Sequence, residues 1–407
     1  MSRHVFAHAR AVLPDRVLDD ALVAVEDGLI TEVRGADGRP APAEAVDARG
    51  ALLIPGIVDT HSDALEKEQR PRPTVEFPAE FAVVSFEGRV RAAGVTTMHH
   101  AVSYQTHVLK DRTIERSLAL AQAVLARAAS GLGLVDHRLL HRLDARDAEA
   151  LRVLARTLDG LPPGDVPPLV SYEDHTPGQG QYRDLDSYRR LVQDQEKIGA
   201  AGAEEWIRQR IAERADGIAQ RAATLAFLSE RALAGRIRLL AHDVESAEEL
   251  AHVRGAGAAV AEFPTTVAAA RAARDAGMPV VAGAPNVLRG GSHSGNVSAT
   301  ELIAAGLVDN LSSDYMPTTL LAAALRLARD GVVPLHRAVR LITSGASGTA
   351  GMADRGALVP GLRADLALVT ADGAQQTVRM SLLAEETRNG EGAPVSVAGL
   401  LGPVGRN

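Results

Sequence analysis

Residues 55–63 read PGIVDTHSD, a tight turn followed by a short apolar strand that ends in two polar side chains, His61 and Asp63. Residues two apart in an extended strand point the same way, so these two side chains can bind one cation. Similar apolar segments recur along the chain, separated by amphipathic stretches rich in Ala, Arg and Leu. The expected strands are 57–61, 95–100, 137–144, 169–174, 237–243, 259–264, 279–286 and 308–314. Eight strands joined by helices predict an α/β protein with a TIM-type (β/α)8 barrel.

The two ends of the chain differ from this middle part. Residues 1–55 and 355–407 contain short alternating segments and Asp-Gly or Pro-Gly turns, without helical periodicity. We expect them to form one small β-sandwich-like domain, with the barrel over 56–354. A polar helical insertion over about 183–235 follows the fourth strand. It is either a lid over the mouth of the barrel or an ordinary solvated helical hairpin.

Composition narrows the classes of function. The 407 residues carry a net charge of −7, which argues against non-specific nucleic-acid binding. Cysteine is absent, so any transition metal must be held by histidine and carboxylate side chains. The N-terminus lacks the apolar core of a signal peptide, and no run of about 18 apolar residues occurs. We therefore expect a cytoplasmic protein that binds no membrane.

Polar side chains gather at the ends of four expected strands, where TIM barrels place their catalytic groups. These ends are Asp59–Asp63, Asp174-His175, His242-Asp243 and Ser313-Asp314. One His or Asp at a strand end is commonly a cap or a structural hydrogen bond, but four such ends in one barrel indicate a metal centre. The predicted ligands are His61, Asp63, His175, His242 and Asp314.

Such a centre would hold one or two divalent ions. Nitrogen and oxygen ligands suit Zn²⁺, Mn²⁺, Fe²⁺ or Mg²⁺, and we expect zinc first. The metal would lower the pKa of a bound water and polarise the bond to be cleaved. Asp314 is placed to accept the proton of that water as a general base, with His242 as the second catalytic side chain.

A two-metal centre also needs a bridging carboxylate. Some barrel hydrolases use a carbamylated lysine on a middle strand, but the only lysines here are Lys67, Lys110 and Lys197. Asp144 on the third strand or Glu173 on the fourth would bridge instead, and Asp144 is favoured. The alternative for Asp144 is a structural salt bridge, for which the candidate partners are Arg138 and Arg142.

Two segments have the composition of anion-binding loops. After the seventh strand comes RGGSHSGN (289–296), in which glycines let backbone N–H groups converge on a phosphate. The run EKEQRPRP (66–73) follows the first strand, with arginines on a loop stiffened by prolines. An ordinary turn and a charged surface loop are the alternatives. The predicted substrate-binding residues are Lys67, Arg70, Arg72, Arg289, Ser292, His293 and Asn296.

These motifs together are specific. PGIVDTHSD, LEK…PRP, DHTPGQ, AEFPTT, GAPNVLRGGSHSGN and LSSDY-x-P resemble the PhnM family of phosphonate metabolism, within the amidohydrolase superfamily. The resemblance implies a diphosphatase that cleaves the α–β phosphoanhydride of α-D-ribose 1-methylphosphonate 5-triphosphate and releases pyrophosphate for the C–P lyase pathway. It also implies a phosphorylated-sugar substrate, and we expect a homo-oligomer that associates with other phosphonate-pathway proteins. The metal and substrate residues named above fall within the family motifs.

The sequence departs from the family pattern at three positions. Ala64 stands where the family usually has Asn, and Asp144 where it usually has Glu. Glu262, in AEFPTT, stands where many superfamily members carry a histidine ligand on the sixth strand. Glu262 is then either a ligand or, like Asp174 and Asp243, a partner that positions ligands.

Two other functions compete with this interpretation. One is a hydrolase of cyclic amides or related C–N bonds, for which phosphate loops would be superfluous. The other is a non-catalytic scaffold barrel, which normally requires lost metal ligands, and here the expected ligands are intact.

Overall fold

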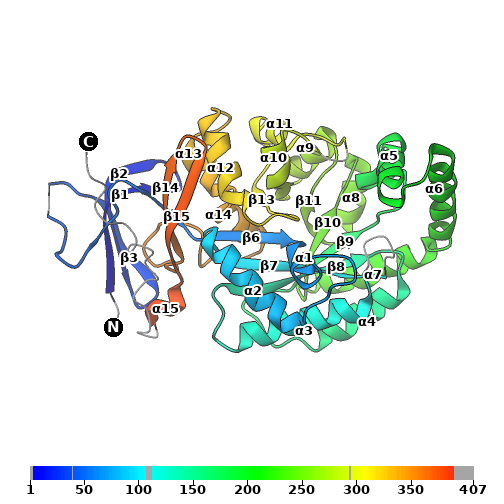
Figure 1. Cartoon of the computed structure of the whole chain (residues 1–407), viewed down its shortest axis with the longest axis horizontal. Helices are drawn as coiled ribbons and strands as arrows, with labels where there is room; N and C mark the ends of the chain where they lie inside the picture. Colours follow the sequence, from blue (N-terminus) through cyan, green and yellow to red (C-terminus); the bar gives the residue numbers. More distant parts are fainter. Residues whose placement is uncertain (1–2, 39, 107–111, 293–294, 389–407) are drawn as a thin grey trace.

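A computed structural model of the chain describes residues 3–38, 40–106, 112–292 and 295–388. His293, one of the predicted substrate-binding residues, lies outside the described residues. Figure 1 shows a barrel of strands and helices with a small sheet packed at one end. Within the described part of the chain, no helix is both long enough and apolar enough to cross a bilayer.

The barrel consists of eight strands that follow one another around the ring in chain order. They are β6 (Ile57–Ser62), β7 (Val95–Tyr104), β8 (Asp136–Asp144), β9 (Leu169–Glu173), β10 (Arg238–His242), β11 (Ala258–Glu262), β12 (Val280–Gly283) and β13 (Asn310–Ser312). All neighbouring pairs are parallel. The ring approaches closure where the backbone N–H of Asp314 donates to the carbonyl oxygen of His61 over 2.9 Å. The predicted (β/α)8 fold is confirmed.

Helices surround this ring and bury their apolar faces against it (Figure 1). They are α1 (Ala64–Gln69), α2 (Ala79–Ala92), α3 (Ile114–Ala129), α4 (Ala148–Asp159), α8 (Ala247–Gly255), α9 (Val267–Asp275), α10 (Ala284–Arg289), α11 (Ala299–Ala304), α12 (Thr319–Arg329), α13 (Leu335–Arg340) and α14 (Ser344–Thr349). The seventh strand is shorter than expected, because α10 begins at Ala284, with Pro285 in its first turn, within the segment predicted to be strand. Inside the ring, Val58, Leu140, Leu240 and Val281 belong to one buried apolar cluster. These side chains fill the middle of the barrel interior, and the candidate ligands lie at its carboxyl end.

A second sheet combines both ends of the chain, as expected. Its strands are β1 (Arg3–Val12), β2 (Val17–Glu26), β3 (Leu29–Gly35), β4 (Val46–Asp47), β5 (Leu52–Pro55), β14 (Leu366–Asp372) and β15 (Gln375–Leu382). β14 pairs antiparallel with β5, which joins the C-terminal hairpin to the N-terminal strands. The passage from β5 into the barrel requires glycine, because a Cβ on Gly56 would lie 2.2 Å from Oγ1 of Thr96. A short helix, α15 (Ala384–Arg388), follows β15.

Three helices and a short 3-10 turn lie between β9 and β10, within the predicted insertion. They are η1 (Gly180–Tyr182), α5 (Leu185–Glu196), α6 (Ala200–Ala215) and α7 (Ile218–Leu233). In Figure 1, α5 and α6 lie at the end of the molecule opposite the terminal sheet. Tyr188, Val192, Ala203 and Ile207 give α5 and α6 a small core of their own. The role of this segment as a lid stays a prediction.

Candidate active site

The candidate ligands meet at the carboxyl end of the barrel because parallel strands bring their ends to one rim. His61, Glu173, His242 and Glu262 are the closing residues of β6, β9, β10 and β11, or lie next to them. Three residues directly after strands have left-handed backbone: Asp243 (φ 57°), Phe263 (φ 53°) and Asp314 (φ 55°). This conformation is costly for residues with a side chain and gathers at functional sites. The backbone therefore turns sharply at three points of this rim.

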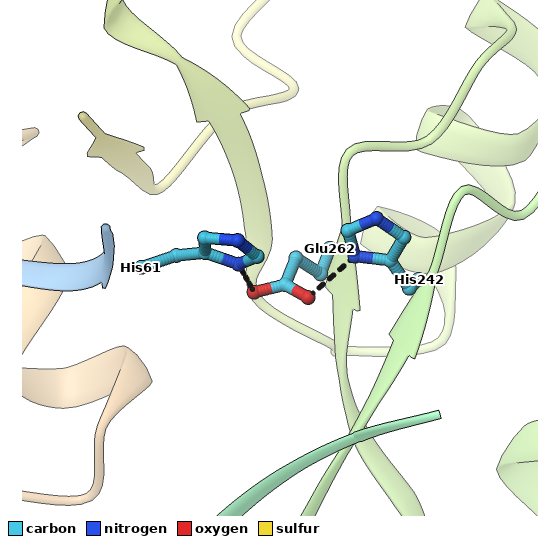
Figure 2. A group of neighbouring side chains, drawn as sticks. All are labelled: His61, His242 and Glu262. Atoms are coloured by element: carbon cyan, nitrogen blue, oxygen red, sulfur yellow. Dashed lines mark hydrogen bonds and ion pairs between the residues drawn. The ribbon is translucent and has the colours of Figure 1, made fainter. Parts of the chain in front are cut away.

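Glu262 links two of the histidines through a fully buried carboxylate (Figure 2). Nδ1 of His61 donates to Oε1 over 2.8 Å, and Nδ1 of His242 donates to Oε2 over 2.7 Å. The hydroxyl of Ser171 adds a third hydrogen bond, to Oε2 over 2.6 Å. Because Nδ1 of each ring is held by Glu262, Nε2 is the nitrogen through which each ring would bind a metal ion, which would displace any proton there. Glu262 thus has the geometry of the positioning partner considered from the sequence.

His242 and His175 face a carboxylate that the structure leaves open. Oδ2 of Asp243 lies 3.3 Å from Nε2 of His242 and 3.4 Å from Nε2 of His175. Among the described residues this oxygen has no hydrogen-bond partner. Asp243 therefore lies within ion-pair distance of both rings, as expected for a carboxylate that positions ligands.

The protonation of these groups reflects the dense charge of the rim. Burial alone would lower the pKa of His242, but the carboxylates of Asp243, Glu173 and Glu262 outweigh it and raise that pKa to about 9. Burial raises the pKa of Asp243 to about 6. Burial opposes ionisation of Glu262 too, yet the two histidines hold its pKa well below the usual range. Glu262 is therefore ionised, as an acceptor of two imidazole protons must be.

A second group of candidate ligands includes His61. It combines His61, Asp63 and Asp314, whose ligand atoms lie within 4.8 Å of one another. Nε2 of His61 is 3.5 Å from Oδ1 of Asp63. A further group within the same limit combines Glu173 with His175 and His242. The structure thus brings all five predicted metal ligands to the rim.

Arg142 lies between these groups and was not predicted as a site residue. Its side chain is 4% exposed and comes from β8. Nη1 donates to Oδ1 of Asp63 over 2.5 Å, and Nε donates to Oε1 of Glu173 over 2.5 Å. A lone arginine in a strand has no sequence pattern of its own. The sequence therefore indicates Arg142 only as a candidate salt-bridge partner of Asp144.

Asp144 lies apart from the candidate ligands. Nη2 of Arg214 donates to its Oδ1 over 2.8 Å, and Nη1 donates to Oδ2 over 2.9 Å. Arg214 comes from α6 of the insertion, and it also reaches Asp174 over 3.1 Å. Asp144 is therefore engaged by an arginine that is 70 residues away in the chain, and it belongs to none of the groups of candidate ligands found among the described residues. Neither expected partner, Arg138 or Arg142, takes this place.

The rim opens into a cavity of about 440 Å³. Its lining combines candidate ligands with four of the predicted substrate-binding residues, namely Lys67, Arg289, Ser292 and Asn296. It also includes Arg112, which no motif had indicated. The Arg112 side chain is 9% exposed and pairs with Glu66 over 2.6 Å, while its Nη1 atom has no partner among the described residues. The lining therefore includes three cationic side chains, those of Lys67, Arg112 and Arg289, which we call the cationic wall, together with carboxylates such as Glu66.

The two arginines of the proline-stiffened loop, Arg70 and Arg72, do not line this cavity. Nε of Arg70 lies 3.9 Å from a carboxylate oxygen of Glu76. Arg72 is exposed and forms a backbone bridge with Val75. The loop turns outward after Gln69, so that Lys67, on α1, faces the cavity and the arginines do not.

Solved structures define the class of protein. The fold is shared with a 5-methylcytosine deaminase from Klebsiella pneumoniae liganded with phosphonocytosine (18% identity, TM-score 0.59, covering 94% of this chain and 96% of that one). It is also shared with an N-acetylglucosamine-6-phosphate deacetylase from Pasteurella multocida (11%, 0.54, 94% and 98%) and with an enamidase of the amidohydrolase superfamily (14%, 0.53, 94% and 94%). The chain has the amidohydrolase fold.

Curated relatives identify the family to which the chain belongs. The chain is 34% identical over 367 residues to the α-D-ribose 1-methylphosphonate 5-triphosphate diphosphatase of Escherichia coli K12, covering 89% of this chain and 94% of that one. The chain belongs to this diphosphatase family, PhnM, of the amidohydrolase superfamily. An imidazolonepropionase from Mycolicibacterium smegmatis is 27% identical and covers 93% of this chain, with 92% of its own length covered. No protein-family model matches the chain.

Proposed function

We propose that the chain hydrolyses the α–β phosphoanhydride of α-D-ribose 1-methylphosphonate 5-triphosphate. The products are pyrophosphate and 5-phospho-α-D-ribose 1-methylphosphonate, which serve phosphonate catabolism. Membership of the diphosphatase family supports the reaction, since the relative that carries this name matches nearly the whole chain. The observation that carries the proposal is one cavity in which candidate metal ligands and cationic side chains face the same space.

The metal centre is assigned to the histidines and carboxylates of the rim, with zinc as the expected ion. A divalent cation held there supplies a Lewis acid that activates water and polarises the phosphoryl group. Glu262 holds the rings of His61 and His242 by their Nδ1 protons, which fixes the orientation of both. Asp314 lines the cavity beside them and accepts the proton of the attacking water.

The cationic wall is assigned to the substrate phosphates. Lys67, Arg112 and Arg289 line the cavity, and a triphosphate needs several such donors because it carries several negative charges. Arg112 is preorganised for this role, since Glu66 holds one edge of its guanidinium, while Nη1 has no hydrogen-bond partner within the described part of the chain. A bond between the α and β phosphorus atoms would then lie between the wall and the rim.

Product analysis by ³¹P NMR tests this proposal. The full chain, with its metal content measured on the same sample, is incubated with ribose 1-methylphosphonate 5-triphosphate. We expect the signals of the triphosphate to be replaced by pyrophosphate and one phosphomonoester, while the phosphonate signal persists. Release of orthophosphate alone would contradict α–β cleavage.

A C–N hydrolase is the second candidate, because the imidazolonepropionase relative also matches most of the chain. A cyclic amide carries no phosphates, so it would leave the positive wall of the cavity without a partner. Activity on an imidazolone with none on the triphosphate would favour this second candidate. We expect the reverse.

A further inference from the structure

We propose that Tyr182, which the helical insertion brings to the rim, donates its hydroxyl to the phosphoryl group that is cleaved. This inference rests on the proposed function and adds a catalytic residue to it. Tyr182 does not lie at a strand end or in an arginine- or glycine-rich loop, so the sequence did not indicate it. The basis of the inference is an uncharged donor that faces the same cavity as the candidate ligands and the cationic wall.

The insertion forms part of the cavity lining. Gln181 and Tyr182 of η1, together with Leu191 and Gln195 of α5, contribute to it. None of these four side chains is charged, whereas the cationic wall and the carboxylates of the rim are. The insertion therefore supplies uncharged groups to a cavity that also holds cations and carboxylates.

The ring of Tyr182 packs between the insertion and a candidate ligand. Its centroid lies 4.4 Å from that of Tyr188, on α5, and 6.0 Å from that of His175. The same ring packs against the small core of α5 and α6. These contacts fix the plane of the ring, so the direction of its hydroxyl is fixed as well.

The hydroxyl of Tyr182 faces the cavity. The charged groups that act most strongly on it are Asp243, Arg112 and Arg142, and all three line the cavity. Within the described part of the chain, this hydroxyl has no hydrogen-bond partner. Burial raises the pKa of Tyr182 further above its usual value, so the hydroxyl keeps its proton at neutral pH. It is therefore a donor available to a bound substrate.

Two hydrogen bonds anchor the segment that carries Tyr182. Nε of Arg214, on α6, donates to Oγ1 of Thr176 over 2.6 Å, just before η1. Nδ2 of Asn296, in the loop after β12, donates to the carbonyl oxygen of Gln181 over 3.3 Å. The insertion is thus tied both to its own far helix and to the opposite loop of the rim. A donor held in place in this way needs no reorganisation when the substrate binds.

An uncharged donor at this position suits phosphoanhydride cleavage. The oxygens of the phosphoryl group carry negative charge, and a fixed donor aimed at them stabilises the charge of the transition state. Hydrogen bonds to charged oxygens are stronger than those between neutral groups. The tyrosine keeps its proton throughout, and the proton of the attacking water still passes to Asp314.

A purely structural role for Tyr182 makes a different prediction. If the ring only filled space between Tyr188 and His175, phenylalanine would replace it without loss, because the ring and its contacts are retained. If the hydroxyl contacts the substrate, the same substitution removes that contact and leaves the packing intact. Tyr182→Phe therefore separates the two roles.

The experiment measures pyrophosphate release from ribose 1-methylphosphonate 5-triphosphate by the full chain loaded with Zn²⁺. We expect kcat/KM to fall by about 10- to 150-fold in Tyr182→Phe, the usual loss when a hydrogen bond to a charged group is removed. Tyr188→Phe is the matched control, because its ring stacks on Tyr182 but the residue does not line the cavity. Its kcat/KM should stay within about 3-fold of the wild type. Metal content and urea unfolding, measured on the same preparations, should match the wild type in both variants.

Three results would overturn the inference. The first is a kcat/KM of Tyr182→Phe within about 3-fold of the wild type. The second is an equal loss in Tyr188→Phe, which would trace the effect to packing of the insertion. The third is a loss accompanied by release of metal, which would mean that Tyr182 acts through His175. A wild type that leaves the triphosphate intact would instead contradict the proposed function, so the two failures are distinguishable.

Discussion

Nδ1 of His242 lies 2.7 Å from Oε2 of Glu262, a carboxylate that also receives Nδ1 of His61. This relationship explains why a glutamate can stand where many superfamily members carry a histidine. Glu262 acts on the centre through two rings at once, and it sets the tautomer of both. The sixth strand thus contributes a carboxylate that orients two rings of the rim.

Glu262→Gln should weaken metal binding. The amide has one acceptor oxygen, so it can hold only one of the two Nδ1 protons, and its NH2 group faces the other ring. Loss of such a partner typically costs about 10- to 100-fold in metal affinity. Competition with a chelator measures the change, and Glu248→Gln, on the exposed face of α8, is the control. Equal affinities in the two variants would remove Glu262 from the centre.

Asp314→Asn should separate catalysis from metal binding. The amide cannot accept the proton of the attacking water, so we expect kcat to fall by about 10²- to 10⁴-fold. Metal content should stay close to that of the wild type, because the amide oxygen can still coordinate and the other predicted ligands, such as His61 and His242, are untouched. Steady-state kinetics and metal analysis on the same preparation check both parts. A kcat within a few-fold of the wild type would exclude Asp314 as the base.

Replacing an arginine that lines the cavity should reduce catalysis more than replacing an arginine on the exposed part of the 66–73 loop. Arg112→Ala and Arg289→Ala each remove a charged donor from the cavity wall, a contact typically worth about 1.5–3 kcal/mol. That corresponds to about 10- to 150-fold in kcat/KM for the triphosphate. Arg72→Ala, on the exposed part of its loop, should change kcat/KM by less than about 3-fold. Equal losses in all three variants would show that the outer loop also reaches the substrate.

The docking of the insertion should depend on pH through Asp174. Burial alone would raise the pKa of this carboxyl, but hydrogen bonds from Thr176, Arg146 and Gln179 outweigh it and lower the pKa to about 2. A pKa below the unfolded value of about 3.9 means that the stabilisation is complete above pH 5 and is lost as the pH falls toward 2.

This shift corresponds to about 2 kcal/mol, of which roughly half should be lost by pH 3. Asp174→Asn should abolish that part of the pH dependence, since asparagine does not titrate. Urea unfolding at pH 6 and at pH 3 measures it, with exposed Asp186→Asn as the control. If the free energy of unfolding of Asp174→Asn varies with pH as it does in the wild type, the carboxylate does not titrate as described.

The sequence predicted the barrel because the fold depends on periodic patterns. Alternating apolar segments and amphipathic helices recur eight times, and a strand end such as His61–Asp63 marks the rim directly. The error at the seventh strand was local: GAPN looks like the end of a strand, but a helix begins there at Ala284, with Pro285 in its first turn. Such boundaries depend on backbone geometry that apolar patterning does not encode.

The site was harder to predict where it depends on pairing across the barrel. Asp144 and Asp243 both follow apolar segments as candidate carboxylates, yet only the fold shows that Arg214 engages the first while the second stays open. Arg112 and Arg142 belong to no motif, and their roles come from partners 46 and 31 residues away. Patterning along one strand therefore indicates which side chains reach the rim, but it does not indicate which partner each one meets there.

Pyrophosphate release before and after metal removal tests the central claim most directly. One preparation is assayed on ribose 1-methylphosphonate 5-triphosphate as isolated, after chelation, and after addition of Zn²⁺. The account predicts one pyrophosphate per substrate consumed, loss of the activity on chelation and its recovery with Zn²⁺. Pyrophosphate release that persists in the metal-free chain, or a reloaded chain that hydrolyses an imidazolone and leaves the triphosphate intact, would contradict it.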